Sequence, residues 1–171
     1  MNYPSPNEYA PYYHTYVGKI DPQTDLISLL KSQFEASALL LSGLTEAQEL
    51  FRYAPGKWSI RELLGHMTDG ERVFAYRAMR IARGDSTPLP GFEQDDYVAV
   101  ANFDRRSAAS LLAEWRGLRE ATIALAEGLN EEAEARMGVA SDNPVSVRAL
   151  LYIIAGHEKH HMEILRERYL V

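Results

Sequence analysis

The chain has 171 residues, of which 46% are hydrophobic and 25% charged, and its formal net charge is −6. These values are typical of a globular protein with a substantial core and exclude a disordered chain. The acidic balance disfavours a dedicated nucleic-acid-binding protein, which needs a basic surface to displace counterions from phosphate groups. The absence of cysteine excludes disulfides, thiolate zinc sites and cysteine nucleophiles.

The beginning of the sequence, residues 1–18, has neither the basic region nor the apolar region of a secretory signal. The longest apolar stretches, such as 149–155, are too short to cross a bilayer. We therefore expect a cytoplasmic protein with no membrane partner.

Residues 1–20 are rich in proline and tyrosine but show no periodicity, which predicts an irregular N-terminal arm. We expect its tyrosine rings to lie against the rest of the protein or against a partner subunit. Asp21-Pro22 has the pattern of a helix start, and apolar residues at three- and four-residue steps predict a first helix over 22–43.

Two capping-box patterns follow. Thr45 opens a short helical turn, and Ser59 with Glu62 opens a long helix predicted over 59–83. The connection over 84–104 contains several turn-forming residues. A connection of this length usually crosses over the fold or carries function.

Asp104 has the position of an N-cap for a third long helix over 105–129, and Asn143-Pro144 introduces a fourth over 145–169. No segment shows sustained alternation of apolar and polar residues between turn signals, so we expect no strands. Four long helices with one long crossover predict an all-α four-helix bundle, which we expect to form a single domain over 1–171.

The last predicted helix carries the most informative motif. His157 and His161 are four residues apart, so they lie on one helix face, where they continue the apolar stripe of Leu150 and Ile154. Two such imidazoles can reach one metal ion at about 2.0–2.1 Å. The alternative is a pair of core histidines held by hydrogen bonds, but burying two imidazoles without a shared role is costly. His160 lies about 100° around the helix and is expected near the rim.

A metal site of this kind needs a third ligand. His66 lies midway along the second long helix and is the only other histidine within a predicted helix, whereas His14 lies in the arm. Three neutral imidazoles leave a coordination position open for water or substrate, which is the pattern of a catalytic site. Zinc or nickel suits imidazole best, because iron and manganese usually require a carboxylate.

Residues 157–161 also read H-E-x-x-H, the zinc-protease motif in which the glutamate is the general base. The sheet that accompanies this motif in proteases is missing, and few residues follow to supply another ligand, so we disfavour a protease. Glu158 remains a candidate base, with a solvated helix residue as the alternative. Asp69 and Glu71 are candidates to accept the second N–H of His66, although solvation is the favoured interpretation of Glu71.

The segment from Gly56 to Arg72, Asn143-Pro144-Val145 and the segment from Gly156 to Tyr169 together resemble the DinB-like superfamily, including its YfiT-like metal-dependent hydrolases. The resemblance covers essentially the whole chain. It implies a DinB-type bundle, usually dimeric, with nickel or zinc bound by three histidines at positions that match His66, His157 and His161. Activities in the family include bacillithiol S-transferases and mycothiol-dependent isomerases, and nothing in the sequence selects among them.

Two classes of function therefore stay open. In the first, a metalloenzyme acts on a small molecule, either by activating water for hydrolysis or by activating a low-molecular-weight thiol for transfer. Glu158, Asp69 and Tyr152 are its candidate acid–base groups. In the second, the bundle is non-catalytic, and its histidines serve stability or partner binding. Arg77, three turns beyond His66 on the same face, could meet an anionic substrate, but a salt bridge to a neighbouring helix is the favoured role.

We also expect a homodimer whose site opens near the 84–104 connection. The run Phe92–Tyr97 is too polar for a core and too aromatic for a plain linker, and together with the arm it offers surface typical of contacts. The alternative is a loop folded over its own bundle.

Overall fold

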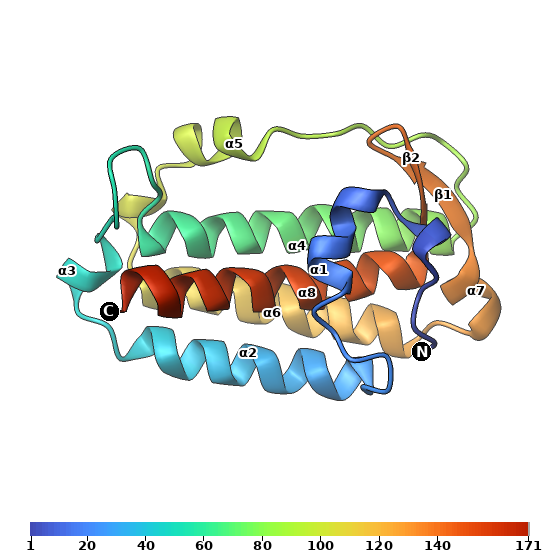
Figure 1. Ribbon diagram of the computed structural model, residues 1–171, viewed down its shortest axis with the longest axis horizontal. Helices are drawn as coiled ribbons and strands as arrows, with labels where there is room; N and C mark the ends of the chain where they lie inside the picture. Colours follow the sequence, from blue (N-terminus) through green and yellow to red (C-terminus); the bar gives the residue numbers. More distant parts are fainter. Residues whose placement is uncertain (171) are drawn as a thin grey trace.

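A computed structural model describes residues 1–170, and within them four long helices run side by side along the molecule (Figure 1). They are α2 (Leu26–Ser42), α4 (Ile60–Ala82), α6 (Ala108–Glu127) and α8 (Val147–Ile164). Both α2 and α4 pack against α6 and α8, so α2 and α4 lie diagonally opposite each other. The predicted four-helix bundle is confirmed.

The connection between α4 and α6 runs back along the length of the bundle, so these two helices are parallel (Figure 1). The predicted crossover is thus confirmed, but it is not structureless. It contains α5 (Gln94–Ala101) and the 3-10 turn η3 (Phe103–Arg105), and both contact α4.

Serine side chains cap the long helices that follow the crossover, and this shifts two predicted starts. Ser107 begins α6 and Ser146 begins α8, because each hydroxyl accepts a hydrogen bond from a backbone N–H of the first turn. Asp104 was therefore the wrong cap, and its carboxylate instead accepts a bond from Ser59 Oγ at 2.5 Å. The first long helix also starts later than predicted, because Asp25 is its cap. At α4 the predicted capping box is present.

The prediction of no strands was wrong for residues 137–146. There β1 (Met137–Ala140) and β2 (Asn143–Ser146) pair antiparallel, with Met137 opposite Ser146. Four-residue strands are too short to show alternation. Their two-residue turn, Ser141-Asp142, has φ of 51° and 61°, the left-handed backbone of a type I′ hairpin. Short helices α3 (Glu46–Glu49) and α7 (Glu131–Ala135) complete the connections.

The N-terminal arm is ordered rather than irregular. It forms the 3-10 turns η1 (Pro6–Glu8) and η2 (Pro11–Tyr13) and the single-turn helix α1 (His14–Val17), which lies across α8 (Figure 1). Gly156 permits this contact, since a Cβ there would stand 2.1 Å from the carbonyl oxygen of Tyr16.

Buried apolar side chains form a cluster towards each end of the bundle. One gathers on residues 74–82 and 147–155, and the other on 60–67 and 162–169. The buried polar side chains of α4 and α8 lie between them, so a polar layer divides the core. A π-helical turn, η4 (Leu165–Tyr169), ends the chain's last helix.

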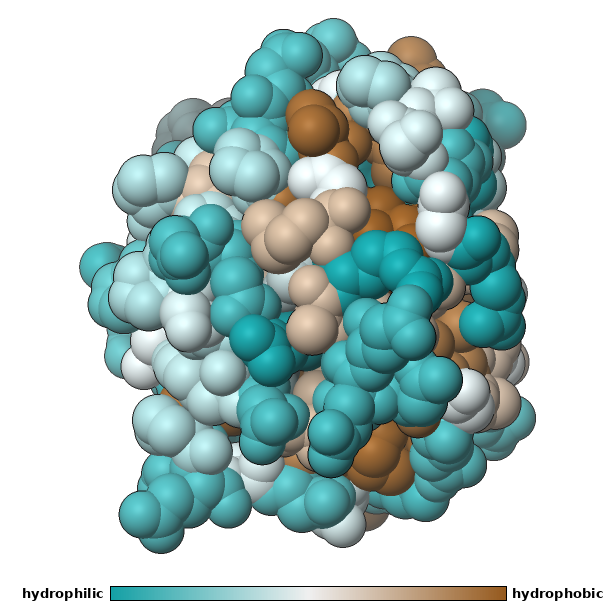
Figure 2. Space-filling model, turned by 90° about the vertical axis from the view of Figure 1, so that its right-hand side faces the viewer, coloured by the Kyte–Doolittle hydropathy of each residue, from teal (hydrophilic) through white to brown (hydrophobic). Residues whose placement is uncertain are grey.

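The end of the bundle that carries the hairpin and α7 is covered mainly by hydrophilic side chains, with hydrophobic ones visible between them (Figure 2). Across residues 1–170, no helix combines the length and the apolar character needed to cross a membrane.

Candidate metal centre

Three histidines meet in the polar layer, as predicted. His66 extends from α4 towards His157 and His161, which stand one turn apart on α8. Their Nε2 atoms form a nearly equilateral triangle, with 3.0 Å from His66 to His157, 3.1 Å from His66 to His161 and 3.0 Å between His157 and His161. The side chains are 3%, 5% and 8% exposed, respectively.

Hydrogen bonds among the rings cannot explain this triangle. In a neutral imidazole one nitrogen either donates or accepts, so three nitrogens at mutual bonding distance always leave at least one unfavourable pair. Three lone pairs directed at one cation remove this conflict. Separations of about 3 Å are also what donors bonded to one ion at about 2.0–2.1 Å would have. The donor set and its geometry therefore fit a divalent metal.

Burial keeps these rings neutral, which is the form that binds metal. Desolvation lowers the pKa of His66 to about 4 and, with neighbouring His66 and His160, that of His161 to about 2. It also lowers the pKa of His157 well below its ordinary value. Protons should therefore compete with a metal for these rings only well below pH 6.5, the ordinary pKa of histidine.

Aromatic rings hold the imidazoles in place. The Trp58 ring lies 4.7 Å from that of His66, and the edges of Tyr16 and Phe74 meet His157 at 5.1 and 6.0 Å between ring centroids. Nδ1 of His161 is buried without a hydrogen-bond partner among the described residues. This ring therefore lacks the carboxylate partner that a ligand imidazole often has.

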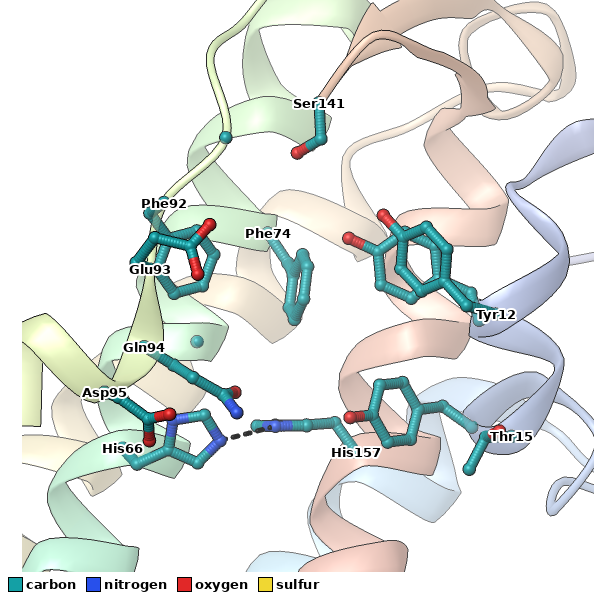
Figure 3. A pocket seen from close by; sticks show the side chains of 14 residues that line it. Tyr12, Thr15, His66, Phe74, Phe92, Glu93, Gln94, Asp95, Ser141 and His157 are labelled. Carbon is teal, nitrogen blue, oxygen red and sulfur yellow. Dashed lines mark hydrogen bonds between the residues drawn. The ribbon is translucent and has the colours of Figure 1, made fainter.

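A pocket of about 520 Å³ opens onto His66 and His157. Figure 3 shows Tyr12 and Thr15 on one side and the segment 92–95 on the other. The histidines lie at one end and Ser141 at the opposite end. The site therefore opens beside the 84–104 connection, as predicted. The other lining residues are Tyr13, Tyr16, Gly70, Phe74 and Gly91.

A second pocket, of about 300 Å³, reaches the same centre from the side of His161. Tyr53, Lys57 and Trp58 contribute to its wall. Asp95 lines both pockets, so the start of α5 stands where the two approaches meet.

Glu158 does not line either pocket. Its carboxylate accepts bonds from Ser37 Oγ at 2.7 Å and from Arg119 Nη1 at 2.8 Å, within the bundle core. Arg119 also donates to both oxygens of Glu71, at 2.9 and 2.8 Å, and Trp115 Nε1 donates to Glu71 at 2.8 Å. The expectation that Glu71 is solvated was wrong, because it is a buried partner of Arg119.

The other candidates from the sequence do not belong to the histidine triangle, although the His160 ring lies 5.0 Å from that of His161. Asp69 is paired with Arg72 at 2.9 Å, and neither side chain is part of the main pocket wall. Tyr152 is buried under the arm, with its hydroxyl 3.4 Å from the Met1 carbonyl. His160 is half-buried and stacks on Tyr16 at 5.4 Å.

Sequence reasoning did not assign the residues that shape the pocket. Tyr12 and Thr15 come from the arm, Gln94 and Asp95 from the start of α5, and Ser141 from the hairpin turn. The acidic and aromatic run 92–97 was the available signal for the α5 side. No pattern places the arm or the hairpin at the pocket, because this requires knowing how they fold onto α8.

Comparisons with known proteins agree with the fold. The family model described as the DinB superfamily matches residues 29–165. A protein of Oceanobacillus iheyensis named "Putative metal-dependent hydrolase" is 28% identical over 114 residues, which is 64% of each chain. The match therefore spans slightly less than two thirds of that relative's length.

Two solved structures from Bacillus subtilis share the fold. YfiT, described as a probable metal-dependent hydrolase with an unusual four-helix-bundle topology, has a TM-score of 0.72 and 16% identity, over 83% of this chain and 85% of its own. The DinB-like protein YjoA has a TM-score of 0.60 and 23% identity, over 84% and 88%.

Proposed function

Since this chain belongs to the DinB superfamily, we propose that it is a divalent-metal-dependent hydrolase of a small molecule, with His66, His157 and His161 as the metal ligands. The triangle of Nε2 atoms carries the proposal, because no arrangement of protons satisfies it and one cation does. Zinc or nickel is the expected metal, since imidazole nitrogen suits both.

A divalent ion at this position would lower the pKa of water or polarise a substrate carbonyl. The protein's own part is to present three neutral ligands on one side and the main pocket on the other. Asp95 lies beside His66 at the pocket wall and is our candidate proton acceptor (Figure 3). Glu158 and Asp69, the acids expected from the sequence, are engaged with Arg119 and Arg72, so we assign Glu158 to positioning α8.

A second candidate is transfer of a low-molecular-weight thiol to an electrophile. The observation that favours it is the pair of pockets that reach the histidines from different sides, because a two-substrate reaction needs two approaches to one centre. Steady-state rates with one substrate, measured with and without added thiol, separate the two reactions.

Metal analysis tests the ligand assignment. We expect purified wild-type protein to bind one zinc or nickel ion and to melt at a higher temperature in its presence, because a ligand of the folded state stabilises it by mass action. His157→Ala should lose this binding. His160→Ala, a change in the neighbouring turn outside the triangle, should keep it. Equal metal content in wild type and His157→Ala would remove the proposal.

We also propose a homodimer. Leu39 on α2 and Val100 on α5 are 78% and 75% exposed, so their apolar side chains are available to contact a second copy. Light scattering decides the point, since a monomer has a mass of 19.3 kDa.

A further inference from the structure

Arg77 is a buried cation without a carboxylate. Arg77 is only 2% exposed. Within residues 1–170, no carboxylate oxygen lies within 4.0 Å of its guanidinium nitrogens, whereas the other buried arginines have such a partner. The other buried arginines differ, because Arg61 pairs with Glu49 at 2.6 Å and Arg119 with Glu71 at 2.8 Å. The salt bridge expected for Arg77 from the sequence is therefore absent from the described chain.

The groups around Arg77 orient its guanidinium without neutralising it. Nη2 donates to the Pro90 carbonyl at 2.6 Å and to Ser141 Oγ at 3.1 Å, and the Phe92 ring lies 5.8 Å away. Burial raises the pKa of Tyr13, and Arg77 opposes this effect from nearby. Both recorded acceptors bond the same nitrogen. The N–H groups of Nε and Nη1 are left for Tyr13, water or a ligand.

This arrangement is costly for the protein alone. A buried charge needs a partner of opposite charge to offset lost hydration. Ser141, which contacts the guanidinium, is the first residue of the type I′ turn and has a φ of 51° for that reason. The cost of the unpaired buried charge is typical of a site that a ligand completes.

Ser141 and the histidines mark opposite ends of one pocket. Arg77 lies directly behind Ser141 and lines a neighbouring pocket of about 340 Å³, which shares Gly91 and Phe92 with the first. His66, Gly70, Phe74 and Arg77 follow one face of α4, and eleven residues of helix span about 16 Å. Ser141, which bonds Arg77, lies at the far end of the pocket from His66 and His157 (Figure 3). Aromatic side chains and the Glu93 carboxylate line the space between, and the carboxylate of Asp95 lies at the histidine end.

We infer that Ser141, with the positive charge of Arg77 directly behind it, binds an oxyanionic group of the substrate, a carboxylate or a phosphate, while the reacting group of the substrate lies at the three histidines. The inference rests on the proposed function for the position of the reaction, but not for the anion site itself. The substrate class is an elongated acid with an apolar or aromatic middle.

Calorimetric titration with 3-phenylpropionate and its neutral amide tests the anion site, with phenyl phosphate as the phosphate probe. Each titration is made on zinc-loaded and on chelated protein, so that direct binding to metal is separated from binding to Arg77. The variants are Arg77→Gln, Arg77→Lys and the control Arg72→Gln, an exposed arginine on the same helix.

We expect wild type to bind an acid more tightly than the amide. Arg77→Gln should weaken acid binding at least about tenfold, the effect of losing a charged hydrogen bond. Arg77→Lys should retain part of it, and Arg72→Gln should match wild type. Stronger binding of the carboxylate or of phenyl phosphate identifies the anion.

Equal binding of acids and amide by wild type, or acid binding unaffected by Arg77→Gln, overturns the inference. If Arg77→Gln does not fold, the wild-type comparison of acid and amide decides alone. If wild type prefers the acid to the amide but binds no zinc, the proposed metal function is overturned and the anion site stands. If wild type binds zinc but does not prefer the acid, the anion site is overturned and the metal function stands.

Discussion

Arg119 joins two buried carboxylates in the centre of the bundle. It bonds Glu71 on α4 and Glu158 on α8 from its position on α6, and its Nη1 also donates to the Leu30 carbonyl on α2 at 2.9 Å. Burial raises the pKa of Glu158, whereas Arg119 and Ser37 favour its charged form. One side chain thus links four helices next to His157.

Replacing Arg119 should therefore destabilise the fold strongly. Arg119→Met leaves two buried carboxylates without a cation, and we expect it to lower the free energy of unfolding by about 3–5 kcal/mol. Arg116→Met, on the same helix, breaks only an exposed pair with Glu35 and should cost less than about 1 kcal/mol. Urea unfolding measures both. Similar losses of unfolding free energy in the two variants would contradict a structural role of Arg119 and its two carboxylate partners.

The residues of the metal site were predictable to different degrees. His157 and His161 follow from helical spacing, because both lie on one face wherever the helix packs. His66 required the additional assumption that α4 faces α8. The pairing of Glu71 with Arg119 could not be predicted, since residues so far apart in sequence meet only because α4 packs against α6.

At the scale of elements, the contact of α1 with α8 depends on Gly156. The Tyr16 carbonyl occupies the space of a side chain at that position, and Tyr16 in turn packs on His157. The arm can form one wall of the pocket only because α8 lacks a Cβ there.

We expect Gly156→Ala to displace α1 and to cost about 1–3 kcal/mol, the range for overpacking a core. Metal should still bind, because the ligands lie on α4 and α8, but access to the pocket should change. Gly117→Ala is the matched control, since nothing lies within 4 Å of its added methyl and helix propensity favours alanine. Melting temperatures and metal titrations test the pair. A Gly156→Ala protein as stable as Gly117→Ala would contradict the model of the contact.

Element boundaries were predicted less well than the helices themselves. Apolar periodicity located the four long helices. Asp21 and Asp104 were plausible N-caps, but Asp25 and Ser107 cap these helices instead. The β1–β2 hairpin and α1 were missed because segments of four residues have no period to detect. Their structure comes from packing on α4 and α8, not from local propensity.

Across the whole molecule, acid should weaken the metal-free fold. The pKa of His66 is about 4 in the folded protein, below its ordinary value of 6.5, so the unfolded chain takes up a proton first as pH falls. Burial opposes the charge of Glu8, but Arg148 and the Ser5 N–H prevail and lower its pKa from 4.5 to about 2. The pKa values of His66 and Glu8 are both lowered in the folded protein, so both groups make the fold less stable as pH falls. Glu158, whose pKa is raised by burial, opposes them.

We therefore expect the free energy of unfolding of chelated protein to fall below about pH 6.5 by up to about 1.4 kcal/mol per pH unit for each such group. Glu8→Gln should cost about 1–3 kcal/mol at pH 7. Its difference from wild type should disappear as pH falls from about 4.5 towards 2, because Glu8 is then protonated in both states. Denaturant titrations at several pH values test this. If the difference in unfolding free energy between wild type and Glu8→Gln stayed constant down to pH 2, the charge of the Glu8 carboxylate would not be what stabilises the fold.

The metal ligands and the pocket walls come from separate parts of the chain. The ligands stand on two bundle helices, whereas the walls come from the arm, the crossover and the hairpin turn. Rearranging a wall segment therefore need not move a ligand. Substitutions in the wall segments can therefore alter which substrate fits the pocket, while the three metal ligands and the reaction at them stay the same.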